Sequence, residues 1–182
     1  AALRAAQTFG KRVLIEQQIS GREYRLLIVD GKMVAAAERI PAYVRGDGVR
    51  TVRALIDETN RDPRRGDGHT KPLTKITVDD TVLAVLAKTG CTLDSVPRKG
   101  EVVYLRHSAN LSTGGTAVDV TDIVHENTRR MAEEAATAVG LDIAGVDVIA
   151  YDIAKRGATV IEVNAAPGIR MHHSPDGGRA RD

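Results

Sequence analysis

Two carboxylates and one carboxamide near the end of the chain have the residue types of a cation site. Asp147 lies in an apolar run at 143–151, while Glu162 and Asn164 lie at the end of a second run that begins at 158. Carboxylate and amide oxygens are the ligands that Mg²⁺ prefers, and Mg²⁺ usually completes its coordination with water and substrate phosphates. The three residues therefore predict a magnesium–phosphate site. The alternative is that they only end two strands at the solvent.

These two apolar runs are expected to form a hairpin that brings the three side chains together. If the turn is centred between Lys155 and Arg156, Asp147 lies opposite Asn164. Glu162 and Asn164 share a face because strand side chains alternate with a period of two. A turn of small residues at 165–170 follows directly and would let the backbone approach a ligand.

The remaining pattern predicts an α+β fold, an antiparallel sheet with helices packed on one side. Asp30-Gly31 between two apolar runs is a strong hairpin signal, because such a turn needs positive φ angles. The predicted strands are 12–19, 24–29, 32–40 and 102–105, and the predicted helices are 1–7, 51–60 capped by Thr51, 79–88, and 124–139 ended by Gly140.

Residues 60–72 differ in composition from the rest of the chain, and we call them the basic loop. They contain two Pro, two Gly and almost no apolar side chain, with Arg61, Arg64, Arg65 and Lys71 among them. A segment with so little to bury is expected to be a mobile surface loop. Its charge suggests contact with an acidic chain.

Composition limits the possible functions. The 182 residues are 42% hydrophobic, which is enough for one packed domain or two small ones. The net charge of +2 and the 3% of aromatic residues argue against a nucleic-acid partner. A single cysteine, Cys91, excludes an intrachain disulfide, and it is either a small buried residue or a nucleophile without an evident activating partner. No apolar run could span a bilayer and no signal sequence opens the chain, so we expect a cytoplasmic protein without membrane contact.

The Glu162-x-Asn164 strand and its small-residue turn resemble the metal-binding strand of the ATP-grasp superfamily of carboxylate–amine ligases. Residues 13–16 followed by 21–23 look like that family's adenine hinge. The resemblance implies adenine contacts from Glu16, Gln18 and Ile19, and ribose contacts from Glu23. The polar segment 110–115, which starts at Asn110, is similar to the loop that closes over phosphates or substrate.

Within this superfamily the chain resembles the cyanophycin synthetase family over nearly its whole length. The shared phrases include residues 21–25, 60–66, 71–76, 92–97 and 164–171. The resemblance implies that residues 1–182 are the C-terminal part of an ATP-grasp domain. The first part of the fold would then precede Ala1, and a Mur-ligase-like domain would follow Asp182. We expect such a chain alone to fold but not to turn over ATP.

The resemblance also implies a reaction, with ATP and Mg²⁺ as its cofactors. ATP would phosphorylate the C-terminal carboxylate of a polyaspartate backbone, and the amine of an incoming aspartate would displace the phosphate. The implied partners are aspartate, an aspartate-rich peptide primer and further copies of the parent enzyme. The rivals are a glutathione-type or D-Ala-D-Ala-type ligase with the same core, and a noncatalytic nucleotide-binding module.

Arginine is suited to contacts with phosphate and carboxylate because its guanidinium forms forked hydrogen bonds. Arg25 and Arg39 are candidate nucleotide contacts, and Arg106 and Arg170 are candidate catalytic residues together with Asn110. Each Arg could instead be a solvated or structural side chain. His172 and His173 lack a third ligand at zinc spacing, so a transition-metal site is the weaker interpretation.

Overall fold

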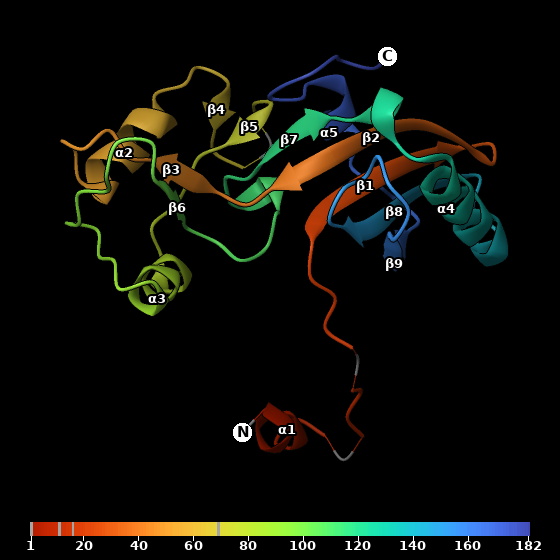
Figure 1. Cartoon of the computed structure of the whole chain (residues 1–182), viewed down its shortest axis with the longest axis horizontal. Helices are drawn as coiled ribbons and strands as arrows, with labels where there is room; N and C mark the ends of the chain where they lie inside the picture. Colours follow the sequence, from red (N-terminus) through yellow and green to blue (C-terminus); the bar gives the residue numbers. More distant parts are fainter. Residues whose placement is uncertain (1, 11, 16, 69) are drawn as a thin grey trace.

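The main element of the protein is a five-stranded antiparallel sheet with the strand order β7-β2-β1-β8-β9 (Figure 1). The computed structural model describes residues 2–10, 12–15, 17–68 and 70–182. The strands are β1 (Arg22–Val29), β2 (Lys32–Ile40), β7 (Thr116–Asp119), β8 (Ile143–Ala150) and β9 (Thr159–Asn164). With the helices described below, this sheet confirms the predicted α+β class.

The β1–β2 hairpin turns at the predicted dipeptide. Asp30 has φ = 50° and Gly31 has φ = 68°, and Val29 pairs directly with Lys32. Two consecutive positive φ angles are the backbone of the tight turn whose twist matches that of the flanking strands. The turn and a bulge between Leu27 and Ile28, where Val34 is an extra residue on β2, together set the register that aligns Glu23 with Arg39 at the other end of the hairpin.

Helix α4 (Glu126–Val139) covers one face of the sheet (Figure 1). Its N-cap is His125, whose ring nitrogen accepts a hydrogen bond from the backbone N–H of Asn127, and Gly140 ends it with φ = 73°. Small residues on the helix, Ala132 and Ala136, allow close approach to the strands. The resulting core is formed by side chains from alternating strand positions: Tyr24, Leu26, Ile28, Val146 and Val148. Each fully buried aliphatic side chain there contributes about 2 kcal/mol.

A second, smaller lobe lies beside the sheet and has its own core (Figure 1). It contains β3 (Tyr43–Arg45) paired with β6 (Val102–Tyr104), and the helices α2 (Val52–Asn60) and α3 (Asp80–Lys88). The predicted cap Thr51 accepts a hydrogen bond from the backbone N–H of Ala54, and Asp79 caps α3 in the same way. Buried residues at helical spacing, including Val52 and Ile56 on α2, pack on Val44 and Leu105.

The basic loop has more regular structure than its composition indicated. It contains β4 (Arg65–Gly66), which pairs in parallel with β5 (Leu73–Thr74). Side-chain contacts attach it to distant parts of the chain as well, among them Arg65 to the carbonyl of Gly114, Arg64 to Asp176, and Arg170 to the carbonyl of Lys71. Its mobility stays a prediction.

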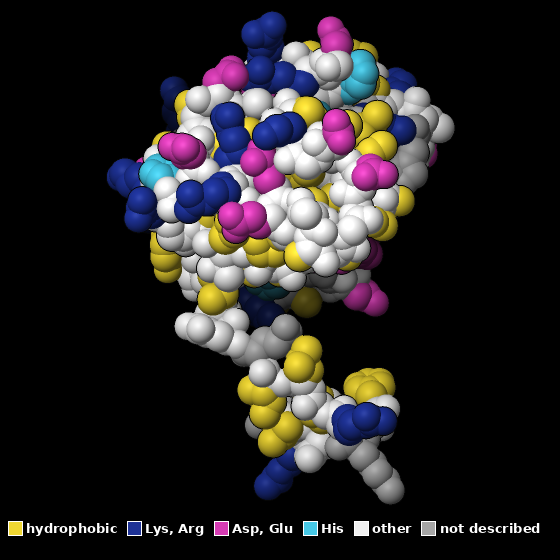
Figure 2. Space-filling model, turned by 90° about the vertical axis from the view of Figure 1, so that its right-hand side faces the viewer, with side chains coloured by type: hydrophobic (Ala, Val, Ile, Leu, Met, Phe, Trp, Pro, Cys, Tyr) yellow, Lys and Arg dark blue, Asp and Glu magenta, His cyan; other side chains and the backbone are white. Residues whose placement is uncertain are grey.

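The predicted strand at 12–19 is wrong for the residues that the structure describes. Residues 12–15 and 17–19 have no regular secondary structure, and they join helix α1 (Ala2–Gln7) to the body. Figure 2 shows this segment standing away from the body with hydrophobic side chains on its surface, and Leu14 and Ile15 are each 79% exposed. A strand needs a partner for its backbone groups, and no described segment pairs with this one.

The C-terminal segment is held along β7. Helix α5 (Arg170–His173) leads into a stretch in which Gly177 bridges Val118 and Asp176 donates its N–H to Ala117. Arg181 then hydrogen-bonds both Asp119 and Asp122, with the shortest contacts at 2.6 and 2.7 Å. The described helices include none that is both long and apolar enough to cross a membrane.

We expect Arg181→Gln to loosen the C-terminal segment, because it leaves the Asp119 carboxylate, whose side chain is 7% exposed, without its cation. The melting temperature at pH 7 should fall by about 3 °C. Arg179→Gln, an exposed arginine in the same segment, is the matched control.

The same interaction predicts a dependence on pH. Burial raises the pKa of Asp119, but hydrogen bonds from Arg181 and Thr121 leave it lowered overall. A carboxylate with a lowered pKa stabilises the fold above its ordinary pKa, and this contribution disappears as the pH falls through the folded value. The difference between the two variants should therefore shrink as the pH falls below about 4. Equal melting temperatures at pH 7 would contradict the assignment.

Candidate functional site

The face of the sheet opposite α4 carries a row of charged side chains. Arg25 on β1 pairs with Asp147 on β8, and Asp147 pairs with Glu162 on β9. Directly paired residues of antiparallel strands point to the same face, so these side chains are neighbours. Arg39 on β2 lies on that face too, because it pairs with Glu23 two residues before Arg25.

Asp147 is the centre of this row. Both its carboxylate oxygens accept hydrogen bonds from Arg25, from Nε at 2.6 Å and from Nη2 at 2.7 Å. Arg39 Nη1 donates to the same carboxylate at 2.7 Å. The three side chains are 10–14% exposed, so little water screens the interaction. One carboxylate therefore holds two guanidinium groups in fixed positions.

Arg39 extends the cluster to the predicted phosphate loop. Its Nη2 donates to Oδ1 of Asn110 at 2.8 Å, and its Nε donates to the carbonyl of Ala109 at 3.2 Å. Glu23, the predicted ribose contact, lies 3.9 Å from Arg39 Nη2 and its side chain is 37% exposed. Arg39 thus adds a side-chain link between the sheet and the loop that leads into β7.

The expected register of the β8–β9 hairpin is wrong by two residues. Asp147 lies opposite Glu162, and Asn164 lies opposite Gly145. The pairs Ile149–Thr159 and Val148–Val160 centre the hairpin on Ala154 rather than between Lys155 and Arg156, and the extra residue Ile161 on β9 then moves the register by one residue. Because the shift is even, all three predicted metal ligands still lie on one face.

The oxygens of this face differ in their availability to a cation. Glu162 is exposed, and its carboxylate has no hydrogen bond or ion pair with the described residues. Asn164 Nδ2 donates to the carbonyl of Gly145 at 3.3 Å, and the side-chain oxygen of Asn164 accepts no hydrogen bond from the described residues. Asp147 is engaged by the two arginines. No group of three or more His, Cys, Asp and Glu side chains suited to a metal occurs in the described chain, so a cation here would need the Asn164 oxygen.

The turn after β9 packs against the row through a glycine. A Cβ atom at Gly145 would lie 2.6 Å from the side chain of Pro167 and 3.3 Å from Cδ of Arg25. Only glycine lets the 165–168 turn and the Arg25 stem occupy these positions together. His172 is buried in α5, and both of its ring nitrogens lack partners among the described residues. Burial and then the Arg25 charge lower the pKa of His172 to about 4, so it is neutral at pH 7.

The other predicted site residues lie around two cavities. Arg106 lines a cavity of about 620 Å³ together with Glu23 and Arg39. Its Nη2 donates to Asp79 at 2.7 Å, while its buried Nε has no partner in the described chain. Arg170 lines a cavity of about 670 Å³ beside Ser112 and Pro167.

Of the predicted adenine contacts, Gln18 and Ile19 do not line these cavities. Gln18 is exposed and Ile19 is half-buried in the segment before β1, whereas Glu16 lies outside the described residues.

Some features of this site could not be read from the sequence. Arg39 is held by the carbonyl of Ala109, a backbone group that any residue could supply. Arg106 is held by the helix cap Asp79, which lies 27 residues away in the sequence. Tyr104 and His107 also line the first cavity; the sequence analysis did not identify them, and their proximity to Arg106 in the sequence is the signal that could have done so. Cys91 is a half-buried free thiol beside the core of the smaller lobe.

The fold and this charged face define an ATP-grasp-type domain, and the comparisons identify which one. The RimK-like ATP-grasp domain profile matches residues 75–177, so the chain belongs to this family. Cyanophycin synthetase of Crocosphaera subtropica is 52% identical over 94% of the chain, and that of Synechocystis is 50% identical over 99%. The chain spans about a fifth of the length of these relatives, 20% and 21% respectively.

Two further similarities concern proteins of glutathione biosynthesis. The bifunctional glutathione biosynthesis protein of Enterococcus faecalis is 39% identical over 99% of this chain and 25% of its own length. The crystal structure of a bifunctional glutathione synthetase from Pasteurella multocida aligns with a TM-score of 0.76 at 36% identity, covering 91% of this chain and 24% of that one. Both the ATP-grasp resemblance and the fold class predicted from the sequence are confirmed.

We expect Gly145→Ala to destabilise the protein by about 1–3 kcal/mol, because the added methyl group overlaps Pro167 and the Arg25 stem. The backbone amide signals of Ala165, Ala166 and Gly168 should move with it. Gly168→Ala, in the same turn but with open space around its Cβ position, is the control and should be neutral or slightly stabilising. Urea unfolding measures the stability. Equal unfolding free energies for the two variants would contradict the packing argument.

Proposed function

We propose that this chain provides one wall of the active site of an ATP-dependent carboxylate–amine ligase. The observation that carries the proposal is the row formed by Arg39, Arg25, Asp147 and Glu162 on the open face of the sheet. It combines guanidiniums for phosphoryl oxygens with carboxylate and amide oxygens for a hard cation. Membership of the RimK-like ATP-grasp family supports this assignment.

Arg25 and Arg39 have the role of charge stabilisation. Phosphoryl transfer to a carboxylate concentrates negative charge on the transferred group, and catalysis consists mainly of positioning and of neutralising that charge. Asp147 holds the two guanidiniums before substrate arrives, so they need little rearrangement during the reaction. Arg106 and Asn110 border the same region and are proposed to contact substrate.

Glu162 and Asn164 would hold a magnesium ion, with Asp147 as the third oxygen ligand through Oδ1, which accepts one hydrogen bond, whereas Oδ2 accepts two. Magnesium bound there would neutralise charge on the nucleotide phosphates. The free Glu162 carboxylate and the uncommitted Asn164 oxygen fit this role.

The proposed reaction is the addition of aspartate to the C-terminus of an aspartate-rich chain. The chain carboxylate attacks the γ-phosphorus of ATP, and ADP leaves. The amine of aspartate then attacks the acyl carbon, the C–O bond breaks and phosphate leaves. The two cyanophycin synthetases described above support this choice, and a cytoplasmic enzyme is part of the proposal.

A glutathione-type acceptor is the second candidate. The Enterococcus relative and the Pasteurella structure support it, but at 39% and 36% identity rather than 50–52%. The two candidates differ in the acceptor and share the nucleotide chemistry. Phosphate release from ATP by the intact parent enzyme, compared between aspartate with an aspartate-rich peptide and glycine with γ-glutamylcysteine, separates them. Nucleotide binding that does not depend on Mg²⁺ would contradict both.

We expect Glu162→Gln and Asn164→Ala each to weaken divalent-cation binding by at least about tenfold. Mn²⁺ can replace Mg²⁺ as a paramagnetic probe, because it broadens the amide signals of nearby residues. In the unaltered chain, broadening should concentrate at 145–148 and 162–165. The control is Glu134→Gln on α4, which removes an exposed carboxylate from the opposite side of the sheet. Unchanged broadening in both site variants would show that the cation binds elsewhere.

A further inference from the structure

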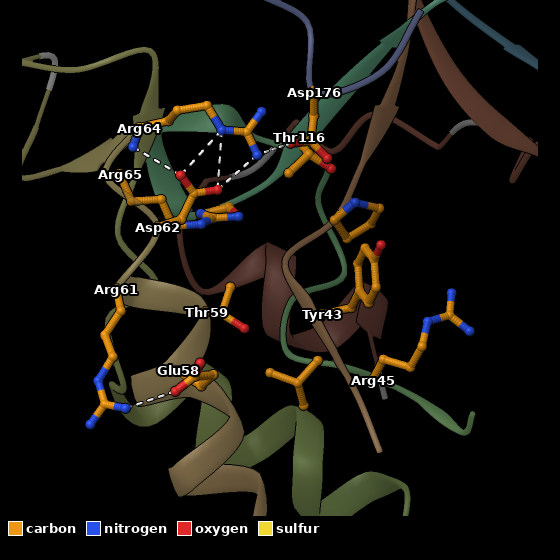
Figure 3. A pocket seen from close by; sticks show the side chains of 13 residues that line it. Tyr43, Arg45, Glu58, Thr59, Arg61, Asp62, Arg64, Arg65, Thr116 and Asp176 are labelled. Atoms are coloured by element: carbon orange, nitrogen blue, oxygen red, sulfur yellow. Dashed lines mark hydrogen bonds and ion pairs between the residues drawn. The ribbon is translucent and has the colours of Figure 1, made fainter. Parts of the chain in front are cut away.

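A third cavity, of about 530 Å³, lies in the smaller lobe between α2, β3 and the basic loop (Figure 3). Four arginines line it: Arg45, Arg61, Arg64 and Arg65. Three carboxylates line it as well, those of Glu58, Asp62 and Asp176. The lining therefore carries one net positive charge.

The three carboxylates are used by only two of the arginines. Arg64 makes hydrogen bonds to Asp62, the shortest at 2.7 Å, and an ion pair with Asp176 at 2.9 Å. Arg61 pairs with Glu58 at 2.7 Å. Figure 3 shows these contacts along one side of the cavity. Arg45 and Arg65 have no ion pair with any described residue.

Arg65 is the unusual member of this group, because only 6% of it is exposed. Its Nη1 donates to the carbonyls of Thr74 at 2.5 Å and Gly114 at 3.1 Å. Burial lowers its pKa, although Asp176 and Asp62 act in the opposite direction from a greater distance. A buried guanidinium without a carboxylate partner costs stability, and an anion entering the cavity would remove that cost.

We propose that this cavity binds a carboxylate group, with Arg65 as the main recognition group and with Tyr43 and Arg45, which line the cavity from β3, as further donors. One net positive charge matches a singly charged carboxylate better than a phosphate dianion. Arginine presents two parallel N–H donors to a carboxylate, and the Tyr43 hydroxyl can add a third donor.

The ligand identity rests on the proposed function, whereas the charge argument for the cavity does not. The side-chain carboxylate of aspartate is the chemistry that fits, supplied either by a free amino acid or by an aspartate-rich chain. A chain is favoured because Arg65 also holds the carbonyl of Gly114. That residue belongs to the 110–115 loop, whose Asn110 contacts Arg39 in the active-site row. A chain bound at both places would help to order the loop between them.

The test is a titration of the full 182-residue chain, followed by amide NMR. The probes are N-acetyl-aspartate amide, which carries one carboxylate, its neutral asparagine analogue, and tetra-aspartate. We expect the two acidic probes to shift the signals of Gly66 and Gly114, and the asparagine analogue to shift neither. Tighter binding of tetra-aspartate would assign the site to a chain, and equal binding to a free amino acid. Both results support a carboxylate site.

Variants decide whether the arginines are responsible. Arg45→Gln and Arg65→Lys should each weaken binding by about tenfold, the loss expected for one charge-assisted hydrogen bond. Arg45 lies at the surface, so its variant remains informative if Arg65→Lys does not fold. Arg53→Gln, an exposed arginine on α2 outside the cavity, is the matched control.

The proposal is overturned if neither acidic probe shifts Gly66 or Gly114, or if Arg45→Gln binds as tightly as Arg53→Gln. Magnesium-dependent nucleotide binding is measured separately on the same chain. If the chain binds the acidic probes but shows no magnesium-dependent nucleotide binding, the proposed function is rejected and the cavity assignment stands.

Discussion

The shared carboxylate of Asp147 is the interaction on which the arrangement of the charged face depends. Two guanidiniums that bond to one carboxylate lie close together in a place that little water reaches, so without Asp147 they would repel each other. Removing one partner from such a buried set costs about 3–5 kcal/mol, because it leaves uncompensated charge. Register makes the cluster possible: a one-residue slip of β8 against β1 would move Asp147 to the α4 face.

This cluster also connects the two parts of the chain, which have separate hydrophobic cores. One core lies between the sheet and α4, and the other fills the smaller lobe. Arg39 connects the first to the 109–110 segment, and Arg65 connects the basic loop to Gly114. Polar contacts of this kind have geometric requirements that apolar packing lacks, so they position loops more accurately than burial alone. The 110–115 loop lies between two such contacts.

The sequence predicted the parts of the fold that depend on local chemistry. The Asp30-Gly31 turn, the Thr51 cap and the Gly140 helix end need particular backbone angles or hydrogen bonds, and only a few residue types supply them. The β8–β9 register was missed because the polar turn does not fix its own centre, which is Ala154 rather than the point between Lys155 and Arg156, and because the extra residue at Ile161 has no sequence signature. The strand at 12–19 was predicted from its apolar residues, but a strand also needs a partner, and periodicity cannot reveal one. For the site, residue types suggested the three oxygen ligands, whereas the engagement of Asp147 by two arginines depends on pairing between strands more than 100 residues apart.

The arginines of the basic loop show why counting charges in a sequence is a poor guide to where a protein attracts anions. The loop is strongly basic, yet two of its arginines form ion pairs. Arg61 pairs with Glu58 three residues away, and Arg64 pairs with the neighbouring Asp62 and with the distant Asp176. Exposed pairs of this kind contribute little to stability, and they leave little field for a ligand. Among the described arginines of the loop, the one without a carboxylate partner is Arg65, which a sequence cannot distinguish from its neighbour Arg64. The two arginines differ in burial. A buried guanidinium without a carboxylate partner is stabilised more by an incoming anion than an exposed guanidinium is. Anion recognition in this lobe should therefore depend on the least exposed arginine of the loop.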